Sequence, residues 1–234
     1  MTHARSFPRS ALFAAIFGLC AGLALPSCAG REGKASKMAR WLEDPTNAKK
    51  LPDGKWYWED LGVTFEVPDT LYVFKECTEL AHASEGDAGW IPVMECHTVG
   101  DSSDVDEFGA EESSGAEPIA LKIYATKKTR PLDERTVTWF ENQYKQAGFR
   151  VDEISYQHSF QNKPGIYAKL HVMDTSTDTP TREILQFMFP KQDIVFIART
   201  EYPFGDTRAI EADWKYILWN FETHPELGEQ GASE

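Results

Sequence analysis

Hydrophobic and polar residues alternate over most of the chain beyond residue 60, with the period that is typical of half-buried β-strands. Gly, Pro, Asn and Asp interrupt the alternation at short intervals, which predicts turns between neighbouring strands. The expected strands are 63–67, 71–77, 91–99, 119–124, 154–160, 166–172, 183–190 and 194–200. The last of these is apolar on both faces, as expected of a central strand covered on two sides.

Two segments have the spacing of amphipathic helices instead. The first follows Pro131, carries acids in its first turn and ends at Gly148. The second runs from 207 to 221, and its apolar stripe consists of Ile210, Trp214, Ile217 and Phe221. We therefore expect an α+β fold for residues 56–222, with one mainly antiparallel sheet and helices packed on both of its faces.

Three aromatic residues stand just before the first clear strand. Trp56 and Trp58 would share one face of a strand, with Tyr57 on the other face. A row of aromatic side chains is also a common platform for carbohydrate. We interpret Trp56 and Trp58 as core residues at the edge of the sheet.

The chain begins with an export signal. Arg5 and Arg9 precede an uncharged apolar run over residues 10–25. The run falls short of the roughly 20 residues that a membrane-spanning helix needs, and small residues follow it directly. Residues 1–27 are therefore predicted to be a signal peptide.

The end of this leader, Leu25-Pro26-Ser27-Cys28, resembles the lipobox of bacterial lipoproteins. The resemblance implies that Cys28 is acylated and becomes the first residue of the mature protein, anchored in a lipid bilayer. Ala29 is not the Asp that retains such proteins in the inner membrane, so we expect the outer membrane of the cell envelope. An ordinary secretory signal, cut after Ala24 or Ser27, is the alternative.

The four cysteines divide evenly under this hypothesis. Cys20 leaves with the leader and Cys28 takes the lipid, which leaves Cys77 and Cys96 in an oxidising compartment. We predict a disulfide between these two. The alternative is a metal site formed by Cys77, His82, Cys96 and His97, but the spacing of known zinc sites is absent.

Three polar segments flank or interrupt the domain. Residues 28–55 are interpreted as the lipidated cysteine, a flexible tether and a loop, 100–117 as an acidic mobile loop and 223–234 as a disordered tail. Candidate calcium ligands in the loop are Asp101, Asp104, Asp106 and Glu107. Phe108 stands where an EF-hand needs an oxygen ligand before its glycine, so we interpret the segment as a solvated charge run and predict no metal site.

The net charge is −13, and removal of the leader leaves 22 basic against 37 acidic side chains, or −15. A surface of this charge repels nucleic acid, which excludes nucleic acid as a partner.

The order of elements from residue 63 to 221, together with Gly62-Val63-Thr64-Phe65-Glu66-Val67-Pro68, resembles the PsbP and DcrB-like group. This resemblance implies an α/β/α sandwich around an antiparallel sheet, in a family that includes small envelope lipoproteins. It transfers no active site.

The chain lacks the common motifs of hydrolases, redox enzymes and nucleotide-binding proteins. We therefore predict a non-catalytic envelope lipoprotein that binds a protein partner as an accessory or assembly factor, with no cofactor. A module that binds a ligand or a divalent metal is the alternative, and a cell-wall hydrolase is a third hypothesis. His158 shares a strand face with Tyr156 and Phe160, and we interpret it as a hydrogen-bonded core histidine.

Overall fold

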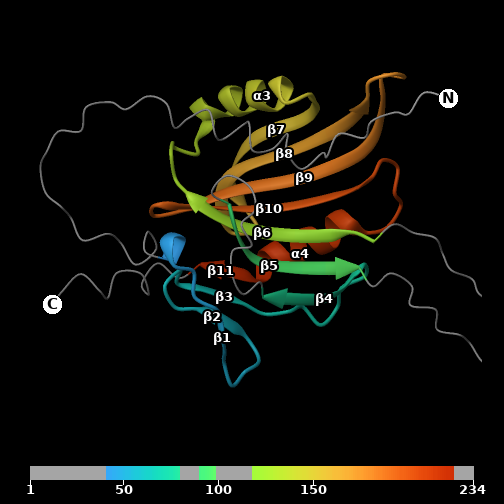
Figure 1. The fold of residues 1–234 in the computed structure, drawn as a ribbon. Helices are drawn as coiled ribbons and strands as arrows, with labels where there is room; N and C mark the ends of the chain where they lie inside the picture. The colour runs from blue at the N-terminus through green and yellow to red at the C-terminus, as the bar shows by residue number, and fades with distance from the viewer. Residues whose placement is uncertain (1–40, 80–89, 99–117, 224–234) are drawn as a thin grey trace, which may run out of the picture.

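The computed structural model describes residues 41–79, 90–98 and 118–223 (Figure 1). The predicted signal peptide, Cys28, most of the tether, the acidic loop with its four candidate ligands and nearly all of the C-terminal tail lie outside the described residues. Trp41 is buried in the same hydrophobic cluster as the first sheet residues, so the described domain begins before residue 56.

Seven antiparallel strands form the larger sheet, in the order β4-β5-β6-β10-β9-β8-β7. The alternating segments of the sequence supply these strands, because each can bury one row of side chains. Their bounds are β4 Phe74–Glu79, β5 Ile91–Thr98, β6 Ala120–Lys127, β7 Phe149–Phe160, β8 Lys163–Asp174, β9 Thr179–Lys191 and β10 Ile194–Pro203. From β7 to β10 the chain is a meander of successive hairpins, and β10 then pairs with β6.

The turns of this meander use left-handed backbone conformations. Gln161 and Asn162, between β7 and β8, have φ angles of 49° and 62°, and Gln192, between β9 and β10, has a φ of 49°. Two-residue turns with positive φ match the twist of the strands that they join. The strands therefore continue up to the turns and are longer than the predicted segments.

Four short antiparallel strands form a second sheet, in the order β1-β2-β3-β11. Their bounds are β1 Lys49–Lys50, β2 Trp56–Trp58, β3 Val63–Phe65 and β11 Phe221–Thr223. The phrase from Gly62 to Pro68 thus contributes an inner strand of this small sheet. The last strand of the domain, β11, pairs with β3 near its beginning.

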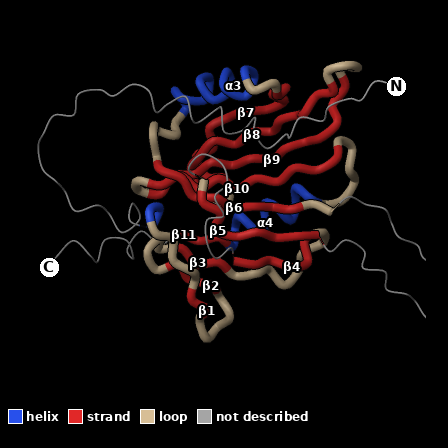
Figure 2. The backbone as a smooth tube through the Cα atoms, in the orientation of Figure 1, coloured by secondary structure: helices blue, strands red, loops and turns tan. Residues whose placement is uncertain are grey.

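The predicted fold class is wrong. We expected one sheet between helical layers, whereas the chain forms two antiparallel sheets and is mostly β, with few helices (Figure 2). The small sheet occupies much of the layer that an α/β/α sandwich would fill with helices. The predicted strand 63–67 contains β3, and Trp56 and Trp58 lie on β2, but strands of two or three residues are too short for their hydrophobic pattern to indicate a separate sheet.

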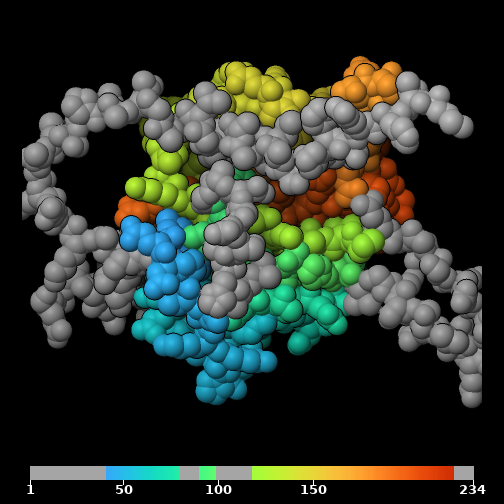
Figure 3. Space-filling model, viewed as in Figure 1, coloured from blue at the N-terminus to red at the C-terminus, as the bar shows by residue number. Residues whose placement is uncertain are grey.

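The two faces of the large sheet belong to different hydrophobic clusters. One cluster joins Phe187 and Phe196 with the small sheet and with α4, Ile210–Asn220. The other joins Met188 and Ile197 with Phe140 and Tyr144 of α3, Val137–Gln146. The space-filling view shows the N-terminal strands in blue below the large sheet and α3 in yellow at its upper edge (Figure 3).

Local signals define both ends of α3. Asp133 and Thr136 form a capping box across a short 3-10 turn that leads into the helix. Gly148, with a φ of 84°, follows the last residues of the helix, and its backbone N–H donates to the carbonyl of Lys145. The predicted stop at Gly148 is confirmed.

The predicted disulfide is also confirmed. Cys77 on β4 and Cys96 on β5 lie opposite each other in the register of the two strands and are bonded. Because both sulfurs are used in this bond, the alternative metal site with thiolate ligands is ruled out.

Buried charged side chains tie the layers together. The carboxylate of Asp213 on α4 accepts backbone N–H bonds from Tyr72, Val73 and Phe74 at 3.0, 2.6 and 3.1 Å. The ammonium of Lys191 donates to the carbonyls of Leu61 and Gly62 and so joins the large sheet to the small one.

Lys163 makes a similar link to α4. Its ammonium donates to the carbonyl of Leu218 at 2.7 Å, in the last turn of the helix, where a positive charge is favoured.

These two lysines make the stability of the fold depend on pH. Burial lowers the pKa of Lys163 and of Lys191 to about 8, from an ordinary value of 10.5. Below pH 8 the lysines are protonated in both states, so the cost of burying the charge is fully present. Between about 8 and 10.5 the folded chain releases these protons first, and the free energy of unfolding must therefore rise.

We expect an increase on the order of 1 kcal/mol per lysine across this window, measured as the urea midpoint at about pH 7 and about pH 9.5. Lys191→Met should remove about half of the increase, whatever its effect on stability at neutral pH. An unchanged pH slope in this variant would show that Lys191 keeps its proton throughout.

Candidate partner-binding surface

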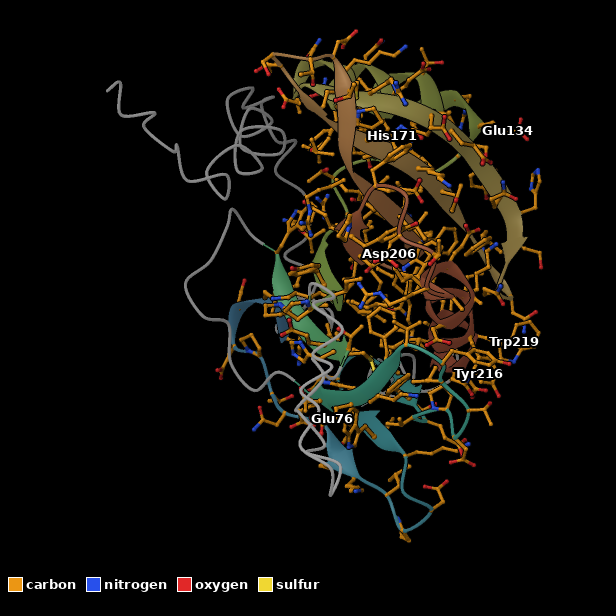
Figure 4. All side chains as sticks on the ribbon, turned by 90° about the vertical axis from the view of Figure 1, so that its right-hand side faces the viewer. Glu76, Glu134, His171, Asp206, Tyr216 and Trp219 are labelled. Carbon is orange, nitrogen blue, oxygen red and sulfur yellow. A yellow bond between two sulfur atoms is a disulfide. The ribbon has the colours of Figure 1, made fainter. Side chains whose placement is uncertain are left out.

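Large aromatic side chains lie exposed on the outer side of α4. Tyr216 is 43% exposed and Trp219 is 49% exposed, and the two are three residues apart, so they share one face of the helix. Figure 4 shows both at the same end of α4. The opposite face buries Trp214, Ile217 and Leu218 in the core.

A third aromatic residue extends this surface. Tyr72 is 75% exposed, and its backbone N–H is bonded to Asp213, one helical turn from Tyr216. We call Tyr72, Tyr216 and Trp219 the α4 aromatic surface. Their backbone is held firmly, because Asp213 is buried and fixes the 72–74 segment against the helix.

The charge around the α4 aromatic surface is mainly negative. Three acids, Asp69, Glu76 and Glu222, are exposed on the segments next to Tyr72 and after Trp219, against one exposed base, Lys75, whose ammonium donates to the carbonyl of Leu71. On the exposed part of α4, Glu211 and Lys215 form an ion pair at 2.6 Å, and this pair adds no net charge. Exposed aromatic groups with an acidic border suit a partner that is apolar at its centre and basic at its rim.

A polar network on the large sheet forms the second candidate. His171, Glu183 and Tyr202 lie opposite one another on β8, β9 and β10. The Tyr202 hydroxyl donates to Glu183, and Lys169 lies 3.1 Å from the same carboxylate. Burial alone would raise the pKa of Glu183, but the hydrogen bonds from Tyr202 and Lys169 outweigh burial, so its pKa lies below the usual range.

His171 has both ring nitrogens occupied by protein groups. Nδ1 lies 2.8 Å from an Arg150 nitrogen, and Nε2 lies 3.4 Å from Glu183. The ring is 4% exposed and lies edge-on to Phe204. Neither nitrogen is free to take a proton from a substrate or to bind a metal, so we interpret the network as structural. His171 lies well away from Tyr216 and Trp219 in Figure 4.

The predictions for individual residues have mixed outcomes. Trp58 is buried and Trp56 packs against the same core, with 6.3 Å between their ring centroids, which confirms the interpretation as core residues. The interpretation of His158 as a core histidine is wrong. Its side chain is 78% exposed and lies 3.1 Å from Glu134. A bulge in the pairing of β7 with β8, between Gln157 and Phe160, changes which residues face the core at this point.

The α4 aromatic surface and the burial of His171 were not predicted from the sequence. Tyr216 and Trp219 fall outside the apolar stripe of α4, and this was a readable sign of exposure. Their proximity to Tyr72 depends on a contact across 141 residues, for which the sequence holds no signal.

The described residues hold neither a cluster of metal-binding side chains nor a membrane-spanning helix. Over 41–79, 90–98 and 118–223, no group of three or more His, Cys, Asp and Glu side chains is placed to hold a metal ion. Within the same ranges, no helix has the length and apolar character needed to cross a membrane.

Comparisons with known proteins identify no family for this chain. No family model matches the chain, and no curated protein matches it. One solved structure, from Bacteroides thetaiotaomicron VPI-5482, is similar over 76% of this chain and 48% of its own, with 10% sequence identity and a TM-score of 0.36. This chain thus spans about half the length of that protein. A similarity at this level assigns neither family nor function.

Proposed function

We propose that this chain is an exported lipoprotein of the bacterial cell envelope, anchored through Cys28, whose folded domain binds a protein partner without catalysing a reaction. Its place is the outer membrane, and its role is that of an accessory or assembly factor. The leader, the lipobox-like end at Cys28 and the disulfide between Cys77 and Cys96 support this proposal, since disulfides persist in oxidising compartments.

The α4 aromatic surface carries the binding part of the proposal. Tyr and Trp are enriched in the centres of protein interfaces, where they bury much area at a small cost in side-chain entropy. Tyr216 and Trp219 keep close to half of their surface in solvent although the helix that bears them has a filled apolar face. The acidic border of Asp69, Glu76 and Glu222 favours a partner with a basic surface.

The anchor is tested by mass spectrometry of the mature N-terminus from membrane fractions. We expect an acylated Cys28 as the first residue, and release of the protein from the membrane in Cys28→Ser. An unmodified N-terminus at another residue would contradict the lipid anchor. It would not bear on the proposal that the α4 aromatic surface binds a partner.

The binding surface is tested by placing a photo-crosslinking amino acid at position 216 or 219 in the full chain. Position 204 is the matched control, because Phe204 is also an exposed aromatic residue, at 45%, but lies against His171. We expect the same discrete adduct from 216 and 219, none from 204, and a crosslinked partner peptide rich in Lys and Arg.

Salt provides a further check. Washing isolated envelopes at high ionic strength before illumination should reduce the adduct, because screening weakens contacts between exposed charges. Equal adducts from all three positions, or none from 216 and 219, would contradict this function for the α4 aromatic surface.

A further inference from the structure

A small hollow opens on the face of the large sheet that carries α3, away from α4. Its floor is apolar and consists of Leu132, Phe140 and Val195, from the segment before α3, from α3 and from β10. Its rim is polar and includes Lys127, Thr129 and Arg130. The free space is about 20 Å³, which accommodates a group the size of a methyl.

Arg130 is held in one orientation at this rim. The carbon of its guanidinium lies 3.8 Å from the centroid of the Trp139 ring on α3. Stacking of this kind fixes the plane of the guanidinium and leaves its edge, which carries the N–H donors, directed elsewhere. The Nε atom is buried and has no hydrogen-bond partner among the described residues.

Three other arginines are paired with carboxylates, whereas Arg150 is bonded to His171. Arg135 pairs with Asp133 at 2.7 Å, Arg208 with Asp206 at 2.7 Å and Arg199 with Glu201 at 3.0 Å. In the part of the chain that the structure describes, no carboxylate lies within 4.0 Å of the Arg130 or Lys127 side-chain nitrogens.

An uncompensated positive site is notable in a chain whose acids outnumber its bases 37 to 24. A buried N–H without a partner costs about 1–3 kcal/mol, so a group that accepts a hydrogen bond from it is favoured there.

We propose that this hollow binds a small monocarboxylate with a short apolar group. The carboxylate accepts hydrogen bonds from the edge of the Arg130 guanidinium, the geometry that arginine offers to carboxylates. Lys127 adds positive charge and the Thr129 hydroxyl a further donor at the rim. The apolar group of the ligand rests on Leu132, Phe140 and Val195, where a purely polar anion such as inorganic phosphate gains nothing.

Calorimetric titration of the full chain in detergent tests the site, with propionate as the probe. We expect saturable binding with a Kd on the order of 1 mM, and much weaker binding of phosphate and of propanol, which lack the apolar group and the charge respectively. Arg130→Gln should weaken propionate binding about tenfold or more, since a charge-assisted hydrogen bond is lost. Arg135→Gln is the matched control and should bind as the wild type does, because Arg135 already pairs with Asp133.

A second measurement needs no variant. Propionate should protect Arg130 of the wild-type chain from an arginine-specific dicarbonyl reagent, as mapped by mass spectrometry, while the exposed Arg135 reacts equally with and without it. Absence of saturable propionate binding, equal binding by Arg130→Gln or equal labelling of Arg130 would each overturn the proposal. Phosphate that binds as tightly as propionate would overturn the role of the apolar floor.

Discussion

Replacing Asp213 by Ala is expected to lower the free energy of unfolding by about 3 kcal/mol. The carboxylate of Asp213 is 1% exposed and accepts three backbone N–H bonds from the segment that enters β4. Alanine leaves these donors without a partner beside the core, and water does not reach all of them. The same change also detaches the 72–74 segment from α4.

Urea unfolding of the purified variants measures this effect. Glu211→Ala is the control, because Glu211 is an acid of the same helix whose ion pair with Lys215 is partly exposed. Its cost should be about 0.5 kcal/mol or less, as for other pairs of this spacing on a helix surface. Similar losses in the two variants would mean that the hydrogen bonds to the 72–74 segment contribute little.

Gly165→Ala is expected to be as damaging, by about 3 kcal/mol, for a purely steric reason. A Cβ atom at Gly165 on β8 would lie 2.2 Å from the carbonyl oxygen of Met188 and 2.8 Å from the ring of Phe187. Both belong to β9, which is covered on its two faces, so the backbone of neighbouring strands would have to move apart. Yield and thermal unfolding of the variant measure the effect.

Gly205→Ala is the matched control for this variant. A Cβ there meets nothing within 4 Å, but the φ of 82° is unfavourable for alanine. The expected cost is about 1 kcal/mol, from the backbone conformation alone. If Gly205→Ala were the more damaging change, close packing between β8 and β9 would not be the reason for glycine at 165.

The sequence predicted the long strands because each buries a regular row of side chains. Ile166, Leu170 and Ile184 lie in the α3 cluster while Phe187 and Phe189 lie in the other, as the alternation indicates. Alternation also predicted the segment that contains β3, but not that β3 belongs to a separate small sheet. Its strands owe their pairing to contacts between distant segments, such as Phe65 with Phe221, and not to any local pattern.

The candidate sites were predictable only in part. The exposure of Tyr216 and Trp219 follows from the helical period, but their neighbour Tyr72 is brought in by tertiary structure. The burial of His171 depends on its place opposite Glu183, and that register is set by the turn between β8 and β9. The role proposed for Arg130 could not be predicted, because it depends on the contact of this side chain with Trp139, nine residues later in the chain.

The pairing of β3 with β11 has a consequence for how the chain reaches its final form. β11 is the last strand of the domain and completes a sheet whose other strands are among the first to be made. During synthesis, Trp58 of β2 and Phe65 of β3 therefore lack their final neighbour Phe221 until the end of the domain has been made. The β7–β10 meander needs only local closure and can form earlier, so the N-terminal sheet is the last part of the domain to become stable.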